Sequence, residues 1–117
     1  MQERDRAAAR RKLDKEMRYY RLAGRNRYPT QHILRSVRLV LGIPVKEIAQ
    51  ELKVNRSVIF RLEQSQERGT ISIKRMGRIA DAMGCKVVYG IVPRNGGTLE
   101  ELELYRLWEK VVEASDQ

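Results

Sequence analysis

The stretch that decides the fold reads Val45-Lys-Glu-Ile-Ala-Gln-Glu-Leu52, then Lys53-Val-Asn55, then Arg56-Ser-Val-Ile-Phe-Arg-Leu-Glu-Gln64. Apolar residues recur at helical spacing on both sides of the middle tripeptide, and Asn55 suits the N-cap of the second segment. Helices of two turns are unstable alone, so these two must pack against each other and their neighbours. Because Ala49 is small, the second helix can approach the first closely. The sequence therefore predicts a helix-turn-helix.

Two further amphipathic segments flank this motif. The first is expected to begin with Thr30 as its N-cap and to end at Gly42, and the second covers 72–83. We expect both to turn their apolar side chains inward and so to complete a helical domain over 29–84. These inward side chains are Ile33, Leu34, Val37, Val40, Leu41, Ile73, Met76, Ile79, Ala80 and Met83.

The chain outside this domain divides into two predicted segments. Residues 1–28 form a basic helical arm, with one helix over 3–23 and a break at 24–29. Residues 85–117 form a short β-strand over 85–92 and a last helix capped by Thr98. The apolar side of that helix is expected to be buried, and it consists of Leu102, Leu104, Tyr105, Trp108, Val111 and Val112. The fold class is all-α with this one strand.

Charge is distributed unevenly along the chain. The formal net charge is +9: residues 1–28 hold 10 basic and 4 acidic groups, residues 29–93 hold 11 and 5, and residues 94–117 hold 3 and 6. A basic body suggests a polyanionic partner, although surplus arginine can also serve solubility alone. The acidic end does not favour DNA.

Several classes of protein are disfavoured. The single Cys85 excludes an internal disulfide and a multi-cysteine zinc site, and His32 alone cannot hold a metal, so no metal or cofactor is expected. No catalytic constellation is visible, and Gly96-Gly97 lacks the spacing and the lysine of a phosphate-binding loop, so an enzyme is not expected. Without an apolar run of about 20 residues or a signal-peptide pattern, the sequence predicts a cytoplasmic protein with no membrane partner.

The outer face of 56–64 carries the candidate DNA contacts. Ser57 and Arg61 share a face four residues apart, and Arg56 lies in the first turn. Arginine can donate two hydrogen bonds to guanine, and serine can bond a base edge or a phosphate, so these three are the predicted base contacts. The predicted contacts to the DNA backbone are Arg35, Lys46, Asn55, Gln64 and Lys74. For five further positions, contact with phosphate and a plain surface role are equal alternatives: Arg35, Arg38, Lys74, Arg75 and Arg78.

Residues 31–83 resemble the Xre or lambda-repressor class of helix-turn-helix domains. The residues that carry the resemblance are Leu41-Gly-Ile, Glu47-Ile-Ala49, Leu52-Lys-Val-Asn-Arg-Ser57 and Ile59-Phe-Arg-Leu-Glu63. The resemblance implies a five-helix domain that binds operator DNA as a dimer, with Arg56, Ser57 and Arg61 where base contacts are made. It also implies that Glu63 stands where an acidic residue usually closes the helix.

Nearly the full length is similar to the family called mobile mystery protein A. The shared features include Arg11-Lys-Leu-Asp14, Gln64-Ser-Gln-Glu-Arg-Gly-Thr-Ile71 and Met83-Gly-Cys-Lys-Val-Val-Tyr-Gly-Ile-Val-Pro-Arg94. Members of that family are typically encoded beside a Fic-domain protein, which implies a toxin–antitoxin-like pair. The strand is also similar to the dimerising strand of the antitoxins that partner HipA kinases.

Some positions depart from the Xre pattern. Pro44 and Val45 stand where these domains often carry a polar cap and a glutamine that grip phosphate, and Lys46 could partly replace that contact. Lys53 stands where glycine often adopts a left-handed turn. Phe60 is unusual on the outer face, where it could touch a thymine methyl group or pack on a neighbouring arm.

The strand predicts a homodimer on a palindromic operator. A lone strand has an unpaired edge, and a second copy could pair with it as an antiparallel ribbon, although a loop packed on the preceding helix is the alternative. The predicted interface residues are Val87, Val88, Tyr89, Ile91 and Val92. The basic arm could dock in the dimer or core, contact DNA, or bind a partner. A protein-interaction module and, more weakly, an RNA-binding protein are the other functions considered.

Overall fold

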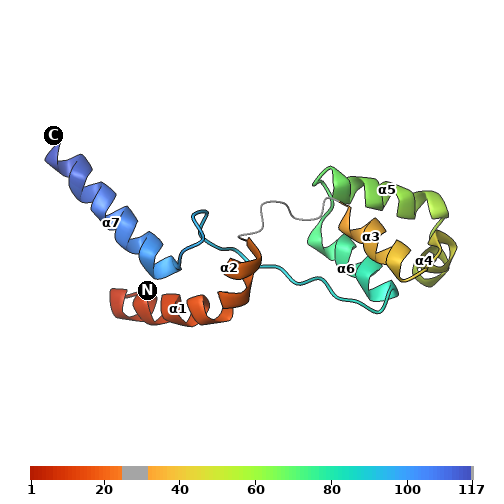
Figure 1. Ribbon diagram of the computed structural model, residues 1–117, viewed down its shortest axis with the longest axis horizontal. Coiled ribbons are helices and arrows are strands. Elements are labelled where there is room, and N and C mark those ends of the chain that lie inside the picture. Colours follow the sequence, from red (N-terminus) through yellow and green to blue (C-terminus); the bar gives the residue numbers. More distant parts are fainter. Residues whose placement is uncertain (25–31, 117) are drawn as a thin grey trace. The chain divides into compact units, whose positions relative to one another are not determined.

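The computed structural model describes residues 1–24 and 32–116, and every regular element in them is a helix (Figure 1). The prediction of an all-α fold is therefore confirmed. The helices are α1 (Glu3–Glu16), α2 (Arg18–Gly24), α3 (Ile33–Val40), α4 (Val45–Leu52), α5 (Arg56–Glu67), α6 (Ile73–Ala82) and α7 (Leu99–Ser115).

The chain divides into two compact units. The central unit spans Tyr28–Val88 and holds α3 to α6, and the terminal unit combines Met1–Arg27 with Tyr89–Gln117. From the sequence, the two ends of the chain were expected to form separate segments. The structure places α1, α2 and α7 in one unit because the basic first helix contacts the acidic last one.

The core of the central unit is aliphatic. Ile48 of α4, Ile59 of α5 and Ile79 of α6 have at most 1% of their surface exposed, and they pack with Leu34 and Met83. The predicted helical spacing therefore places the right side chains inward in α4 and α5. In α6 it fails at Ile73, the first residue of the helix, which is 50% exposed. These helices lie together in Figure 1, with α3 packed against α5 and α6.

One ion pair is buried inside this core. The Nε and Nη2 atoms of Arg38 donate to the two carboxylate oxygens of Glu63 at 2.7 and 3.3 Å, and Arg38 Nη1 donates to the carbonyl of Ile43 at 3.4 Å. Both residues are less than 10% exposed. A buried charge requires this kind of bidentate pairing. From the sequence, phosphate contact and a plain surface role were equal alternatives for Arg38, so this buried role was missed.

The buried pair explains why part of the prediction for α3 is wrong. Leu34 and Arg38, four residues apart, face the core, so the predicted inward residues Ile33, Val40 and Leu41 are turned outward. Val40 is 82% exposed. Thr30, the predicted cap, lies outside the described residues, and the N-cap position of α3 is His32.

Within its described residues the central unit has four helices, α3 to α6, so the predicted five-helix core is not confirmed. The physical reason is that the apolar pattern between Gly42 and Gly84 supports only three helices beyond α3. The remaining helices of the chain pack in the terminal unit.

The turn between α4 and α5 is tight. Lys53 has φ 57° and ψ 46°, and the N–H of Val54 donates to the carbonyl of Ala49 at 3.0 Å. Asn55 has the extended backbone of an N-cap, but its side chain makes no capping hydrogen bond. The left-handed residue closes α4 and turns the chain directly into α5.

We expect Lys53→Gly to stabilise the central unit. The left-handed backbone costs a β-carbon-bearing residue about 1 kcal/mol, and glycine removes most of that cost at some loss in chain entropy. The midpoint of urea unfolding should therefore rise. Lys53→Ala keeps the strain and serves as the control, and a gain equal to that of glycine would contradict the explanation.

The predicted strand over 85–92 is not found in the single chain, where these residues form neither strand nor helix. A strand needs a neighbour, and among the described residues no backbone hydrogen bond joins 86–92 to another segment. At Gly90 an added β-carbon would lie 2.9 Å from Met17 Sδ and from Tyr20 Cγ. This segment therefore passes close to α2, with Tyr89 and Ile91 exposed on either side of the glycine.

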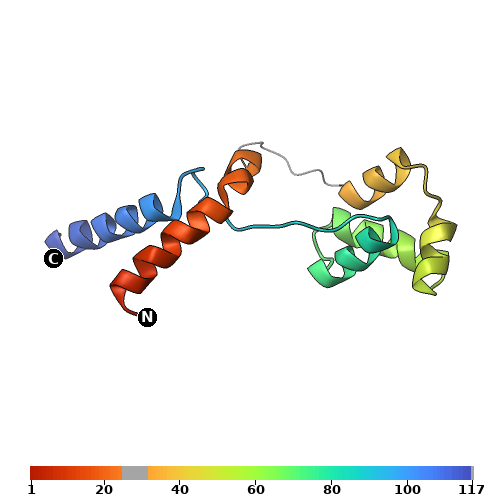
Figure 2. The same cartoon turned by 90° about the horizontal axis from the view of Figure 1, so that it is seen from below.

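The single helix predicted over 3–23 is interrupted at Met17, which ends α1 with φ −92° and ψ 5°. α1 lies beside the start of α7, as both Figure 1 and Figure 2 show. The Asp14 carboxylate accepts from the backbone N–H groups of Leu99 and Glu100 at 2.7 and 3.3 Å. A residue of α1 thus supplies an N-terminal cap to α7.

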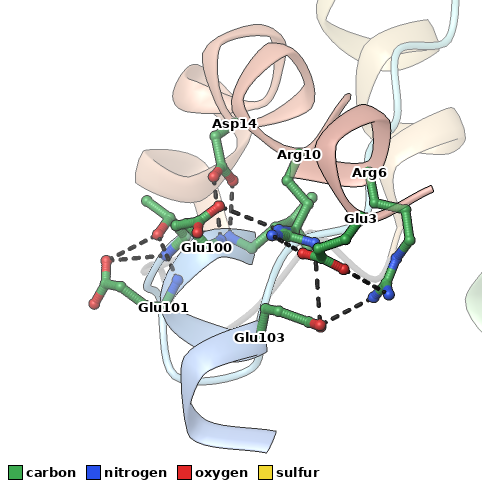
Figure 3. A network of polar contacts seen from close by, with 9 residues as sticks. Glu3, Arg6, Arg10, Asp14, Glu100, Glu101 and Glu103 are labelled. Carbon is green, nitrogen blue, oxygen red and sulfur yellow. Dashed lines mark hydrogen bonds and ion pairs between the residues drawn. The ribbon is translucent and has the colours of Figure 1, made fainter. Parts of the chain in front are cut away.

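Charge pairs extend this contact along α1 (Figure 3). Arg10 Nε donates to Glu100 at 3.1 Å, and Arg6 Nη2 donates to Glu103 at 2.9 Å. The hydrogen bonds that Arg10 donates to Glu100 and Glu3 raise the pKa of Arg10. The predicted Thr98 cap is confirmed, because Thr98 and Glu101 form a reciprocal capping box.

The predicted burial of the apolar side of α7 is wrong. Tyr105 is 55% exposed and Trp108 is 60% exposed, and Leu104 and Val111 are similarly open. The hydrogen bonds between α1 and α7 involve only the first turns of α7, at Leu99, Glu100 and Glu103. Within the described residues of the terminal unit, the rest of the apolar side is uncovered.

Candidate nucleic-acid interface

One edge of α5 is exposed and mostly polar. Ser57, Arg61 and Gln64 lie along it, with Phe60 between them at 50% exposure. The opposite side of the helix carries Ile59, which is 0% exposed. Helical periodicity thus gives α5 one face that is buried in the core and one exposed polar face. The buried ion pair between Arg38 and Glu63 also holds α5 in place.

Arg61 lies along this edge. Its Nε donates to the carbonyl of Ser57 at 3.4 Å, which ties the base of the guanidinium to the helix one turn earlier. The two predicted base contacts are therefore adjacent in space. Arg56, the third, is exposed in the first turn.

The N-terminal end of α5 gathers positive charge. Lys46, Asn55 and Arg56 line one shallow hollow together with Lys53 and Gln50. Free backbone N–H groups at a helix N-terminus attract phosphate, and three cations here add to that attraction. The structure therefore brings together two predicted backbone contacts and one predicted base contact. Lys53 was missed because its sequence position signalled only a turn.

A second hollow, here called the arginine groove, lies between α5 and α6. Arg61, Arg75 and Arg78 surround it, and Leu52, Val54, Val58, Leu62 and Ser65 complete its lining. The spacing of Arg75 and Arg78, three residues apart on one helix, was the available signal for their shared face. Arg35 on α3 and Lys74 on α6 are exposed but line neither hollow.

The predicted dimer residues fall into two groups. Val88, Tyr89 and Ile91 are 65%, 65% and 85% exposed, whereas Val87 and Val92 are half-buried. The exposed group offers a surface for pairing. Exposed and half-buried side chains do not alternate regularly along the segment, as they would along a strand facing a core.

The described residues show no group of three or more His, Cys, Asp or Glu side chains placed to hold a metal ion. None of the helices in that part of the chain combines the length and apolarity needed to cross a bilayer. Comparisons of the chain with family models, with curated proteins and with solved structures find no match.

Proposed function

We propose that this protein is a sequence-specific regulator of transcription that binds double-stranded DNA through α5. The observation that carries the proposal is the exposed edge of Ser57, Arg61 and Gln64 on a helix whose opposite side is anchored by the fully buried Ile59. A single α-helix fits the major groove, and this edge offers donors for base edges. The segment from α4 to α5 acts as a helix-turn-helix of the Xre or lambda-repressor type.

The roles of individual residues follow from their positions. Arg56, Ser57 and Arg61 contact bases, and the cations around the N-terminal end of α5 neutralise phosphates. Lys46 and Asn55 are the backbone contacts best supported by the geometry, because they share a hollow with Arg56. Gln64 extends the same edge, and Arg35 and Lys74 are peripheral backbone contacts.

The finer parts of the proposal rest on the family resemblance. They are a cytoplasmic homodimer on a palindromic operator, repression of its own operon, and an antitoxin-like partnership with a Fic-domain protein. The exposed Val88, Tyr89 and Ile91 support pairing of two copies along this segment. Pairing would give the extended backbone the partner that a strand needs.

Selection of bound duplexes from a random pool tests the proposed function. A shared motif with two half-sites one helical turn apart is the expected result. The affinity for that duplex should fall with salt at a slope of about −5 in log–log form if six phosphates are contacted. Recovery of no motif, or equal binding of an RNA duplex, would refute sequence-specific DNA binding.

Arg61→Ala should relax base preference at one position of each half-site. A bidentate arginine–guanine contact contributes about 1–3 kcal/mol of discrimination, which is lost when the guanidinium is removed. Binding of all single-base variants of the selected site should be measured by fluorescence anisotropy. Arg106→Ala, an exposed arginine on α7, is the control and should leave the preference intact. Unchanged discrimination by the Arg61 variant would rule out this residue as a base reader.

A protein-interaction module is the second candidate function. The observation that favours it is the uncovered apolar side of α7, with Leu104, Trp108 and Val111 each at least 60% exposed. Soluble proteins seldom expose such a continuous patch without a partner. Co-purification with a neighbouring gene product, in the absence of any operator binding, would select this candidate over the first.

A further inference from the structure

The last turns of α7 carry an apolar patch with acidic residues around it. Trp108 and Val112 line one hollow together with Glu109, Glu113 and Asp116. Trp108 is 60% exposed, and Val111 beside it is 64% exposed. A hydrogen bond to Glu109 and the charge of that carboxylate raise the pKa of Tyr105. We call this surface the acidic helix end.

The arginine groove of the central unit has the opposite character. Its apolar lining is half-buried, and Arg61, Arg75 and Arg78 are all exposed around it. Three positive groups around an apolar floor favour a ligand that is itself apolar and edged by negative charge. A bare phosphate satisfies only the arginines, because it leaves Val58 and Leu62 uncovered.

The two surfaces carry opposite charges of equal number, and each surrounds apolar side chains. The groove has three arginines around aliphatic side chains, and the acidic helix end has three carboxylates around Trp108 and Val112. We propose that the acidic helix end of one copy of this chain docks in the arginine groove of a second copy. Since each copy has both surfaces, two reciprocal contacts about a two-fold axis close a dimer.

A second copy carries the complementary partner for each surface, and within its own unit each surface is open. α1 engages only the first turns of α7, through Arg6, Arg10 and Asp14. The acidic helix end begins one turn later and remains exposed to Ser115. Pairing of α7 with α7 instead would bring the same three carboxylates together and is disfavoured by like charge.

This dimer has a regulatory consequence that rests on the proposed function. Arg61 lines the groove and is also a proposed base contact, so docking covers it. Occupancy of the groove and DNA binding are therefore mutually exclusive. The dimer formed through the groove is a resting state, distinct from the pair that reads a palindromic operator.

The test measures mass and tryptophan emission on the full chain. Trp108 is the only tryptophan, so its emission reports directly on the acidic helix end. Light scattering over a range of concentrations should show a transition from one chain to two, with a blue shift in emission as the dimer forms. A mass of one chain at all concentrations, or a mass that rises beyond two, contradicts the proposal.

Charge reversal identifies the surfaces. Glu109→Lys with Glu113→Lys, and separately Arg75→Glu with Arg78→Glu, should each raise the dissociation constant roughly 10-fold or more, because attraction becomes repulsion. The chain with all four changes should regain the dimer. Glu16→Lys with Glu51→Lys is the matched control for added charge and should dimerise normally. Circular dichroism confirms that each variant is folded.

Two outcomes would overturn the proposal at this stage. The first is a dimer that ignores both reversals, which would place the interface elsewhere, for example at Val88 to Ile91. The second is a failure of the chain with all four changes to regain the dimer, which would show that the two surfaces do not contact each other.

A DNA-binding measurement on the same variants separates this inference from the proposed function. Glu109→Lys with Glu113→Lys should bind a selected duplex at least about 3-fold more tightly than the control with the same added charge, since docking no longer competes. Charge-dependent dimers without any DNA binding would leave the dimer standing and refute the proposed function. If the chain binds DNA but its mass does not change with the charge reversals, the proposed function stands and the proposed dimer is refuted.

Discussion

Glu63→Leu should lower the free energy of unfolding of the central unit by about 3–5 kcal/mol, because it leaves a buried guanidinium without its counter-charge. Arg38 lies at 8% exposure and donates two hydrogen bonds to Glu63, and its remaining contact is the carbonyl of Ile43 at 3.4 Å. Glu63 is the carboxylate that pairs with Arg38 in the described residues. Urea unfolding followed by circular dichroism measures the loss.

A double-mutant cycle separates the pair from the space it fills. Arg38→Met alone should cost a similar amount, since it strands a buried carboxylate, whereas Arg38→Met with Glu63→Leu should recover most of the loss. Arg35→Met, an exposed arginine on the same helix, is the control and should change stability by less than about 0.5 kcal/mol. Additive losses in the cycle would show that the two side chains are not coupled.

Ile59→Ala should destabilise the central unit by about 2–5 kcal/mol, since it removes buried methyl groups and leaves a cavity. Ile59 is fully buried against α4 and α6, and it anchors the helix that carries the proposed DNA contacts. The variant should therefore also lose DNA affinity in proportion to its unfolded fraction.

Phe60→Ala is the matched control, because the next residue along the same helix is 50% exposed. It removes a larger side chain yet should cost little stability. A loss at Phe60 as large as that at Ile59 would mean that α5 is rotated relative to the described arrangement. The midpoint and slope of urea unfolding distinguish a change in stability from a change in cooperativity.

The central unit could be predicted from local signals where periodicity and caps agree. Ile48, Ile59 and Ile79 recur at helical spacing and are all buried, and Gly42 and Gly84 both have the positive φ of a helix end. α3 was less predictable because its core face includes Arg38. A charged residue reads as exposed unless its partner is known, and Glu63 is 25 residues away.

The terminal unit was less predictable because its contacts are distant in sequence. Asp14 caps α7 across 85 residues, and no local pattern indicates such a contact. The apolar stripe of α7 predicts a buried face, yet periodicity does not say what covers it. For the candidate site, helical spacing predicts that Ser57 and Arg61 share an edge, whereas the approach of Arg75 and Arg78 to Arg61 depends on how α6 packs on α5.

The central claim is that the exposed edge of α5 is the surface that meets DNA. Backbone amide spectra of the labelled protein, recorded during addition of a selected duplex, test it most directly. We expect the largest changes on Arg56 to Gln64 and on Lys46, with α1 unaffected at saturation. Release of the acidic helix end from the arginine groove adds smaller changes at Trp108 to Asp116. Changes confined to α1 or α7, or an α5 that stays unperturbed while DNA is bound, would contradict it.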